Sequence, residues 1–151
     1  MTNNSELRSE LPVSLGLEAD SRGSLLVQGR GSLAKVQRLT VGSERGGNGR
    51  IELKDGGLLE VTGSLEFHTK GELVISALKP VPITVNKTAA LAGSLQVDLT
   101  AGGGKPSSRK KWTLLKAKKL TGRFDTVDLI GEEGATLSLE YGETELIVVV
   151  E

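Results

Sequence analysis

The chain has 151 residues, a length that suits one domain with its own hydrophobic core. It contains no cysteine, which excludes disulfides, thiolate catalysis and cysteine-based metal sites. Nineteen basic and nineteen acidic residues give a formal net charge of zero, so no global field attracts nucleic acid or anionic lipid. Aromatic residues make up only 3% of the chain, against 37% hydrophobic residues, so we expect a core of stacked aliphatic side chains.

We expect the first segment, residues 1–22, to be a lead-in or N-terminal cap of this single domain. It contains no apolar run of signal-peptide length, and no later segment has the roughly 20 apolar residues that span a bilayer. The chain as given is therefore expected to be soluble, with no signal peptide and no membrane insertion. Its apolar residues Val13, Leu15 and Leu17 form a partial copy of the pattern that follows.

Residues 23–99 contain an internal repeat. A shift of 26 residues places 23–42 over 49–68 and matches apolar positions throughout: Leu25 with Ile51, Val27 with Leu53, Leu33 with Leu59, Leu39 with Leu65, and Val41 with Phe67. Each unit reads Gly-x-apolar-x-apolar, an alternation that predicts a short strand with one buried face. A third copy has longer connections and consists of Leu73 and Ile75, then Ile83 and Val85, then Leu95, Val97 and Leu99.

Three short strands in each repeat, separated by Gly, Asn and Asp, predict an all-β fold: a right-handed, three-sided parallel β-helix, or solenoid, of about three coils. Each coil stacks on the next, so the inward aliphatic side chains form columns along the axis. We predict one column of Leu25, Ile51 and Leu73, and a second column of Leu33, Leu59 and Ile83.

The pattern changes after Leu99, and we divide the rest into a loop, residues 100–111, and a C-terminal cap, residues 112–151. The cap should contain two alternating strands up to residue 129 and then a β-hairpin over residues 135–151, with its turn near Gly142 and Glu143. An uncapped solenoid exposes unpaired backbone, so its terminal units must differ from the internal ones. We expect Trp112 and Phe124 to cover the apolar end of the columns.

The cap resembles a known family. Trp112-Thr-Leu-Leu, then Leu120-Thr-Gly-Arg-Phe-Asp-Thr-Val, then Ala135-Thr-Leu-Ser-Leu-Glu-Tyr are similar to the C-terminal end of passengers with autotransporter-associated β-strand repeats. The resemblance implies a right-handed β-helix, a non-catalytic structural or interaction module, and a position at the bacterial cell surface or outside the cell. Such repeats usually carry Thr, Ser and Asn at outward positions, whereas this chain carries Lys, Glu and Arg, so an engineered scaffold derived from one stays an alternative.

Two glycine-rich stretches resemble binding motifs only superficially. The segment Gly29-x-Gly31-x-x-Ala34 matches a dinucleotide-binding turn, but no amphipathic helix follows, so we interpret it as a solenoid corner. Residues 102–107 resemble a phosphate loop, but Pro106 stands where the hydroxyl residue is required. No cofactor is therefore predicted.

Metal and catalytic sites also lack the required residues. Residues 46–54 begin like a calcium nonapeptide, yet Ile51 occupies the position of the ligand Asp. His68 is the only histidine, so any triad or histidine metal site depends on it alone. It precedes the turn Thr69-Lys70-Gly71, and we interpret it as a solvated turn side chain. We predict no catalytic residue and no metal ligand.

Charge is strongly polarised near the C-terminus. A candidate anionic-ligand patch consists of Lys105, Arg109, Lys110, Lys111, Lys116, Lys118, Lys119 and Arg123, with no acid among them, and the chain after it carries eight acids and no base. These basic residues could bind an anionic surface glycan, or they could pair with the acidic strands of the cap, the interpretation that we favour. A single Trp without aromatic interleaving gives no support for nucleic-acid binding.

Two functional hypotheses follow from the sequence. The first is the non-catalytic structural or interaction module described above. The alternative is a carbohydrate-binding or weakly catalytic β-helix module that acts on anionic glycans. Self-association and surface glycans are the partners that both hypotheses leave open.

Overall fold

The computed structural model describes residues 5–76, 81–99, 110–131 and 134–151, and these contain β-strands and no helix. The strands are β1 (Glu6–Leu15), β2 (Arg22–Gln28), β3 (Leu33–Val41), β4 (Asn48–Lys54), β5 (Leu58–Val61), β6 (Leu65–Phe67), β7 (Gly71–Ile75), β8 (Ile83–Leu91), β9 (Ser94–Asp98), β10 (Lys110–Gly122), β11 (Thr126–Ile130), β12 (Leu137–Tyr141) and β13 (Glu145–Val150). The predicted loop at residues 100–109 lies outside the described residues.

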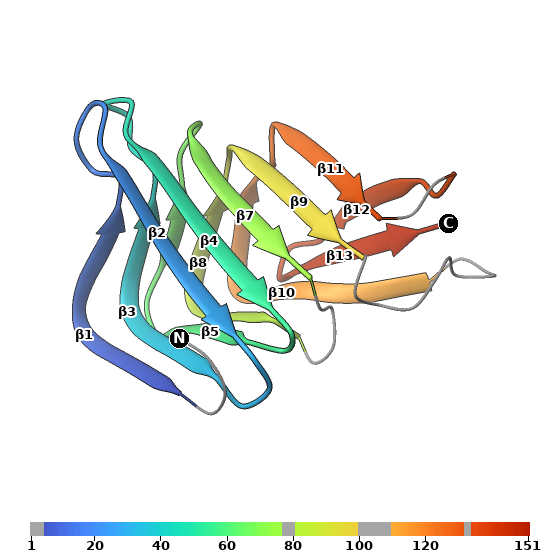
Figure 1. Cartoon of the computed structure of the whole chain (residues 1–151), viewed down its shortest axis with the longest axis horizontal. Coiled ribbons are helices and arrows are strands. Elements are labelled where there is room, and N and C mark those ends of the chain that lie inside the picture. The colour runs from blue at the N-terminus through green and yellow to red at the C-terminus, as the bar shows by residue number, and fades with distance from the viewer. Residues whose placement is uncertain (1–4, 77–80, 100–109, 132–133) are drawn as a thin grey trace.

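The strands form two sheets that wind together as a β-solenoid (Figure 1). One sheet has the order β2-β4-β7-β9-β11, and all its pairings are parallel. The other has the order β1-β3-β5-β8-β10-β13-β12, with β6 beside β3 and β8. Each strand from β1 to β9 pairs with its counterpart one turn later. The predicted solenoid of about three turns with antiparallel strands at its C-terminal end is confirmed.

The long strands of the second sheet bend and so form two sides of the solenoid. The first half of β3 pairs with β5 and its second half pairs with β6, and a register shift separates the two halves of β1 and of β10 in the same place. Figure 1 shows this bend in β1, β3 and β8, opposite the straight strands of the first sheet. Several pairs of short strands that the sequence predicts are thus the two halves of one longer, bent strand.

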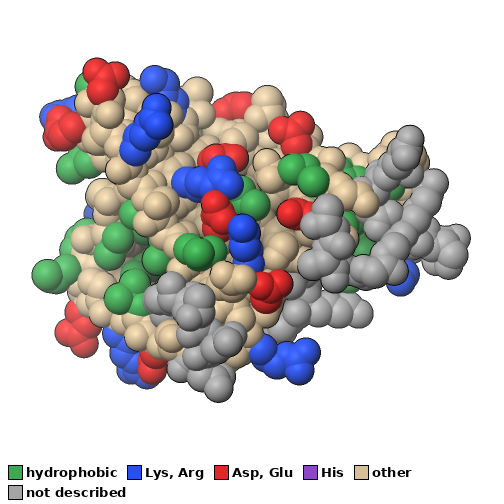
Figure 2. Space-filling view, viewed as in Figure 1, with side chains coloured by type: hydrophobic (Ala, Val, Ile, Leu, Met, Phe, Trp, Pro, Cys, Tyr) green, Lys and Arg blue, Asp and Glu red, His purple; other side chains and the backbone are tan. Residues whose placement is uncertain are grey.

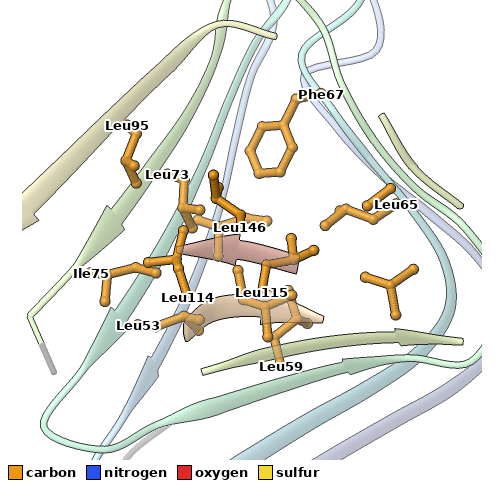
Figure 3. Close-up of a cluster of buried hydrophobic side chains, with 14 of the residues drawn as sticks. Leu53, Leu59, Leu65, Phe67, Leu73, Ile75, Leu95, Leu114, Leu115 and Leu146 are labelled. Carbon is orange, nitrogen blue, oxygen red and sulfur yellow. The ribbon is translucent and has the colours of Figure 1, made fainter. Parts of the chain in front are cut away.

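The first predicted column of inward side chains is confirmed. Leu25 lies beside Ile51, Ile51 beside Leu73, and the column continues to Leu95 and then Val127. Ile51, Leu73 and Leu95 are fully buried. Because every layer contributes one aliphatic side chain to this line, the core is continuous along the axis, as Figure 3 shows for Leu73 and Leu95.

The second predicted column was wrong at its first member. Leu59 lies beside Ile83 as expected, but the residue beside Leu59 in β3 is Ala34, whereas Leu33 lies beside Leu58. Ala34 is fully buried and Leu33 is partly exposed. The corner before β3 is one residue longer than the corner before β5, and a slip of one residue along a strand reverses the face of every side chain.

The third copy of the repeat was also assigned wrongly in part. Leu95 and Val97 continue the line of Leu73 and Ile75 in the first sheet, so they are not the third side of that coil. The third side is the second half of β8, where Ala89 lies beside Leu65. This segment presents a small alanine and lacks the Gly-x-apolar unit, so the sequence pattern did not reveal it.

The C-terminal strands first add a layer to the solenoid and then cover its end. Leu115 of β10 lies beside Ile83, and β11 pairs parallel with β9, so these two strands add a further layer. The predicted hairpin is confirmed: β12 and β13 are antiparallel, and β13 also pairs with the first half of β10. Leu146 of β13 is fully buried and lies close to Leu114 and Leu115 (Figure 3).

The two large aromatic residues of the cap differ in position. Phe124 is buried, and its ring meets the ring of Phe67 edge to face, with centroids 5.6 Å apart and planes at 70°. Such a contact stabilises an aromatic pair beyond the area it buries. Trp112 is only partly buried against the same core. Phe124 is therefore part of the core beside β6, and Trp112 lies at the margin of that core.

Candidate functional site

Charged side chains of β4 and β7, in the middle of the first sheet, are paired with one another. Arg50 contacts Glu52 in its own strand and Glu72 in the next coil at 2.6 Å, and Lys54 lies 3.1 Å from Glu52. Burial opposes ionisation of Glu52, but hydrogen bonds from Arg50 and Lys54 outweigh it, so the pKa of Glu52 lies below its usual value. Figure 2 shows acidic and basic side chains side by side in the middle of this face. The Arg50–Glu72 pair joins two neighbouring coils, and the other two pairs lie within β4.

The same arrangement recurs elsewhere between neighbouring coils. Lys35 lies 3.5 Å from Glu60, and the Arg45 guanidinium lies 3.1 Å from the Glu18 carboxylate. In each pair the partners lie on adjacent coils and carry opposite charge. A surface pair of this kind contributes only a few tenths of a kcal/mol, up to about 1 kcal/mol, but it removes repulsion along the ladder.

The predicted basic patch is divided by the fold. Lys105 and Arg109 lie outside the described residues, and the remaining six are exposed: Lys110, Lys111, Lys116, Lys118, Lys119 and Arg123. Lys111 lies 2.8 Å from Glu140 of the hairpin, and Lys116 lies 3.8 Å from Glu145. The guanidinium carbon of Arg123 lies 4.9 Å from the centroid of the Tyr141 ring. Lys111, Lys116 and Arg123 thus contact residues of the hairpin, in line with the interpretation that the sequence favoured.

Lys118 and Lys119 instead border an open surface hollow of about 760 Å³, together with Lys87 from β8. The lining also includes Thr88, Leu120, Glu143 and Thr144. Within the described part of the chain, none of these three lysines takes part in an ion pair. The sequence did not associate Lys87 with the basic run, because only the pairing of β8 with β10 brings it there.

The other residues that the sequence singled out lie in turns, at a corner or in the core. The His68 carbonyl accepts the Gly71 amide in a turn, as expected, but its side chain is only 17% exposed, with Nε2 3.3 Å from the Glu66 carboxylate. It is therefore less solvated than the sequence suggested. Gly29 and Gly31 lie at a corner that the Ser32 amide closes on the Gly29 carbonyl. Ile51 is fully buried and points away from any solvent ion.

No family model matches the chain, and no similar protein was found among curated proteins or among solved structures. In the described ranges, no three His, Asp or Glu side chains gather closely enough to hold a metal ion. Nor do these ranges contain a helix long and apolar enough to cross a membrane. Functional inference therefore depends on the arrangement of this chain's own residues.

Proposed function

We propose that the protein is a non-catalytic structural or interaction module: a rigid β-solenoid segment of a bacterial surface protein of the autotransporter-passenger type, or an engineered scaffold derived from one. The observation that carries the proposal is the unbroken parallel ladder from β2 to β11, in which the side chains pointing into the core are aliphatic in every layer. Because each coil contacts its two neighbours along its whole length, such a stack transmits load and resists bending.

The pairing of charged side chains on the surface also supports a structural module. Glu52 and Glu72 of the first sheet are ion-paired with Arg50 and Lys54, and the single histidine is held beside Glu66 at a corner. Charges arranged in this way stabilise a repeating surface and keep exposed edges soluble. A surface location follows from the resemblance of the cap segments and is part of the proposal.

Two measurements test this proposal. Native-state hydrogen exchange should show that amides of β4, β7 and β9 open together, with free energies close to that of global unfolding. Separate opening of single coils would contradict a rigid module. A screen with glycoside, ester and phosphate substrates should give no turnover above the buffer rate. Turnover that His68→Ala abolishes, while the melting temperature is retained, would contradict the non-catalytic assignment.

A further inference from the structure

At several places, charged side chains on neighbouring coils meet as pairs of opposite charge. Arg50 meets Glu72 and Lys35 meets Glu60, so opposite charges face each other. Where β10 bends against β8, Lys119 lies beside Thr88, and Lys87 and Lys118 border the same hollow. Three positive side chains therefore gather around this hollow without an ion-paired carboxylate among the described residues.

The backbone explains how these side chains come to point outward together. The register between β8 and β10 shifts at this place: Ala117 lies beside Val85, but Lys119 lies beside Thr88. Two consecutive exposed residues thus occur on each strand, at 86–87 and at 118–119. Since neighbouring strands are only about 4.8 Å apart, ammonium groups projecting from both strands can reach one common ligand.

Hydrogen bonds fix both sides of the hollow. The Lys87 amide donates to the Gly63 carbonyl of the preceding coil, and the Leu120 amide donates to the Glu143 carbonyl in the turn of the hairpin. The Ala117 amide donates to the Thr144 carbonyl in the same turn. The lysines therefore project from a backbone that is ordered before any ligand binds, which lowers the entropic cost of binding.

The arrangement costs stability unless an anion occupies the hollow. Lys119 lies beside Thr88, so the lysines are not directly opposite one another, but like charges that share one hollow still repel each other. Glu143 contributes the one carboxylate in the described lining, and it forms no ion pair with the three lysines. A bound oxyanion would turn this repulsion into charge-assisted hydrogen bonds, which are stronger than neutral ones.

We propose that the hollow bordered by Lys87, Lys118 and Lys119 is a binding site for an anionic oligosaccharide, whose sulfate or carboxylate groups accept hydrogen bonds from the three ammonium groups. The hydroxyls of Thr88 and Thr144 suit sugar hydroxyl groups, and Leu120 offers a small apolar surface to a sugar ring. This site goes beyond the structural role proposed above, and neither proposal depends on the other.

The lining favours a glycan over two other polyanions. The large hydrophobic side chains that the described surface exposes are Leu7, Leu11, Leu17, Leu26 and Ile130, and none of them borders the hollow. The site therefore lacks the apolar anchors that insert into a membrane surface. The described lining also contains no aromatic ring on which a nucleic-acid base could stack.

The test compares two variants that each remove three positive charges. K87Q/K118Q/K119Q removes the three ammonium groups of the site, whereas R22Q/R30Q/K70Q removes three exposed positive charges that make no ion pair among the described residues. We measure the affinity of a fluorescent heparin hexasaccharide at two salt concentrations. The site variant should bind at least about tenfold more weakly, equivalent to roughly 1.4 kcal/mol, and the control should change less than about twofold. Equal weakening in both variants, or no binding by the unmodified chain, overturns the proposal.

A second readout separates binding from folding. Without ligand, K87Q/K118Q/K119Q should melt at the same temperature as the unmodified chain or higher, because repulsion is relieved. The hexasaccharide should raise the melting temperature of the unmodified chain and of K87R/K118R/K119R, but not that of the glutamine variant. A lower melting temperature of the ligand-free glutamine variant would show that the lysines have a structural role and would overturn the proposal.

Three further probes decide the class of ligand. Inorganic sulfate at equal charge, vesicles containing phosphatidylserine, and a single-stranded oligonucleotide should all bind more weakly than the hexasaccharide. Binding of any of them as tight as that of the hexasaccharide, and equally sensitive to K87Q/K118Q/K119Q, overturns the assignment to an oligosaccharide.

Discussion

The two ends of the solenoid complete the same columns of aliphatic side chains in different ways. At the C-terminal end, β13 lies on β10, and Leu146, Val148 and Val150 are fully buried. At the N-terminal end, Leu7 belongs to the column of Ala34, yet it is 41% exposed because β1 is the outermost strand of its sheet. One end therefore buries its last layer, and the other leaves it partly in solvent.

The N-terminal end is protected by other means. Pro12 interrupts β1 at a register shift, and it has no amide hydrogen to donate to an incoming strand. Glu6 and Arg8 form an ion pair on the same edge. Proline, irregular register and charge all discourage pairing with another chain. Hydrophobic side chains nevertheless reach the surface over the β1–β2 end (Figure 2). A solenoid end can thus be closed by pairing or kept open by an edge that pairs poorly.

The largest expected difference between the ends comes from deletion. Removal of residues 135–151 takes away the buried side chains of β13 and exposes the edge of β10. Each buried aliphatic side chain contributes about 1.5 to 3 kcal/mol, against a typical total stability of about 5 to 15 kcal/mol. We expect aggregation or loss of cooperative unfolding, measured by light scattering and thermal melting.

The matching deletion of residues 1–15 should have a smaller effect. It removes one outer strand whose side chains are mostly exposed, so the shortened chain should still melt cooperatively, at a lower temperature. If the chain without residues 135–151 stays monomeric and melts as before, the hairpin does not close the solenoid.

Identical substitutions at the two ends should differ in size. Leu146→Ala removes a fully buried side chain and should cost about 2 to 5 kcal/mol. Leu7→Ala removes a side chain that is 41% exposed and should cost about 1 kcal/mol or less. Urea unfolding measures both values, and the slope with denaturant should stay constant. Equal costs would mean that the N-terminal layer is covered in solution.

Substitution of a corner glycine by alanine should cost about the same stability at both ends of the solenoid. Gly16 and Gly122 have φ of 73° and 71°, and a Cβ atom at either would collide with a backbone oxygen of a neighbouring coil, that of Asn48 or that of Leu91. Replacement by Ala should cost about 2 kcal/mol or more at both positions, because strained backbone and a collision add up. Gly46→Ala is the control, since its φ of 92° is strained but its nearest contact is a lysine side chain at 3.6 Å. It should cost less in the same urea titration.

The smallest expected effect is a dependence on alkaline pH at the capped end. Burial raises the pKa of Tyr141, and the Phe124 amide donates a hydrogen bond to its hydroxyl at 3.2 Å. The folded pKa lies above the unfolded value of about 10, because burial disfavours the phenolate more than the Phe124 amide favours it. The stability that comes from burying the neutral phenol is therefore present below pH 10 and is lost as pH rises through the folded pKa. Tyr141→Phe should cost about 0.5 to 1.5 kcal/mol at neutral pH.

The unmodified chain and the Tyr141→Phe variant should therefore differ less in their free energy of unfolding above pH 10 than at neutral pH. Tyr141 is the only tyrosine, so the comparison isolates its titration from that of the lysines, which both chains share. A constant difference between pH 8 and pH 11 would show that the hydroxyl does not contribute through its ionisation.

The sequence by itself determined the type of fold and much of its core. Alternating aliphatic residues at a spacing near 26 predict stacked strands, and the line of Leu25, Ile51 and Leu73 is where the pattern places it. The hairpin of β12 and β13 was equally readable, because its alternation and its turn residues are local in sequence. Local signals suffice where one face must be buried and the connection is short.

Only the tertiary structure decided the register between coils and the neighbours of surface charges. A corner one residue longer places Ala34 in the core instead of Leu33, and such a change reverses a strand without altering its composition. Lys87 reaches Lys118 and Lys119 through pairing between strands more than twenty residues apart. That pairing depends on the packing of the whole coil, so no local pattern records which charges will meet.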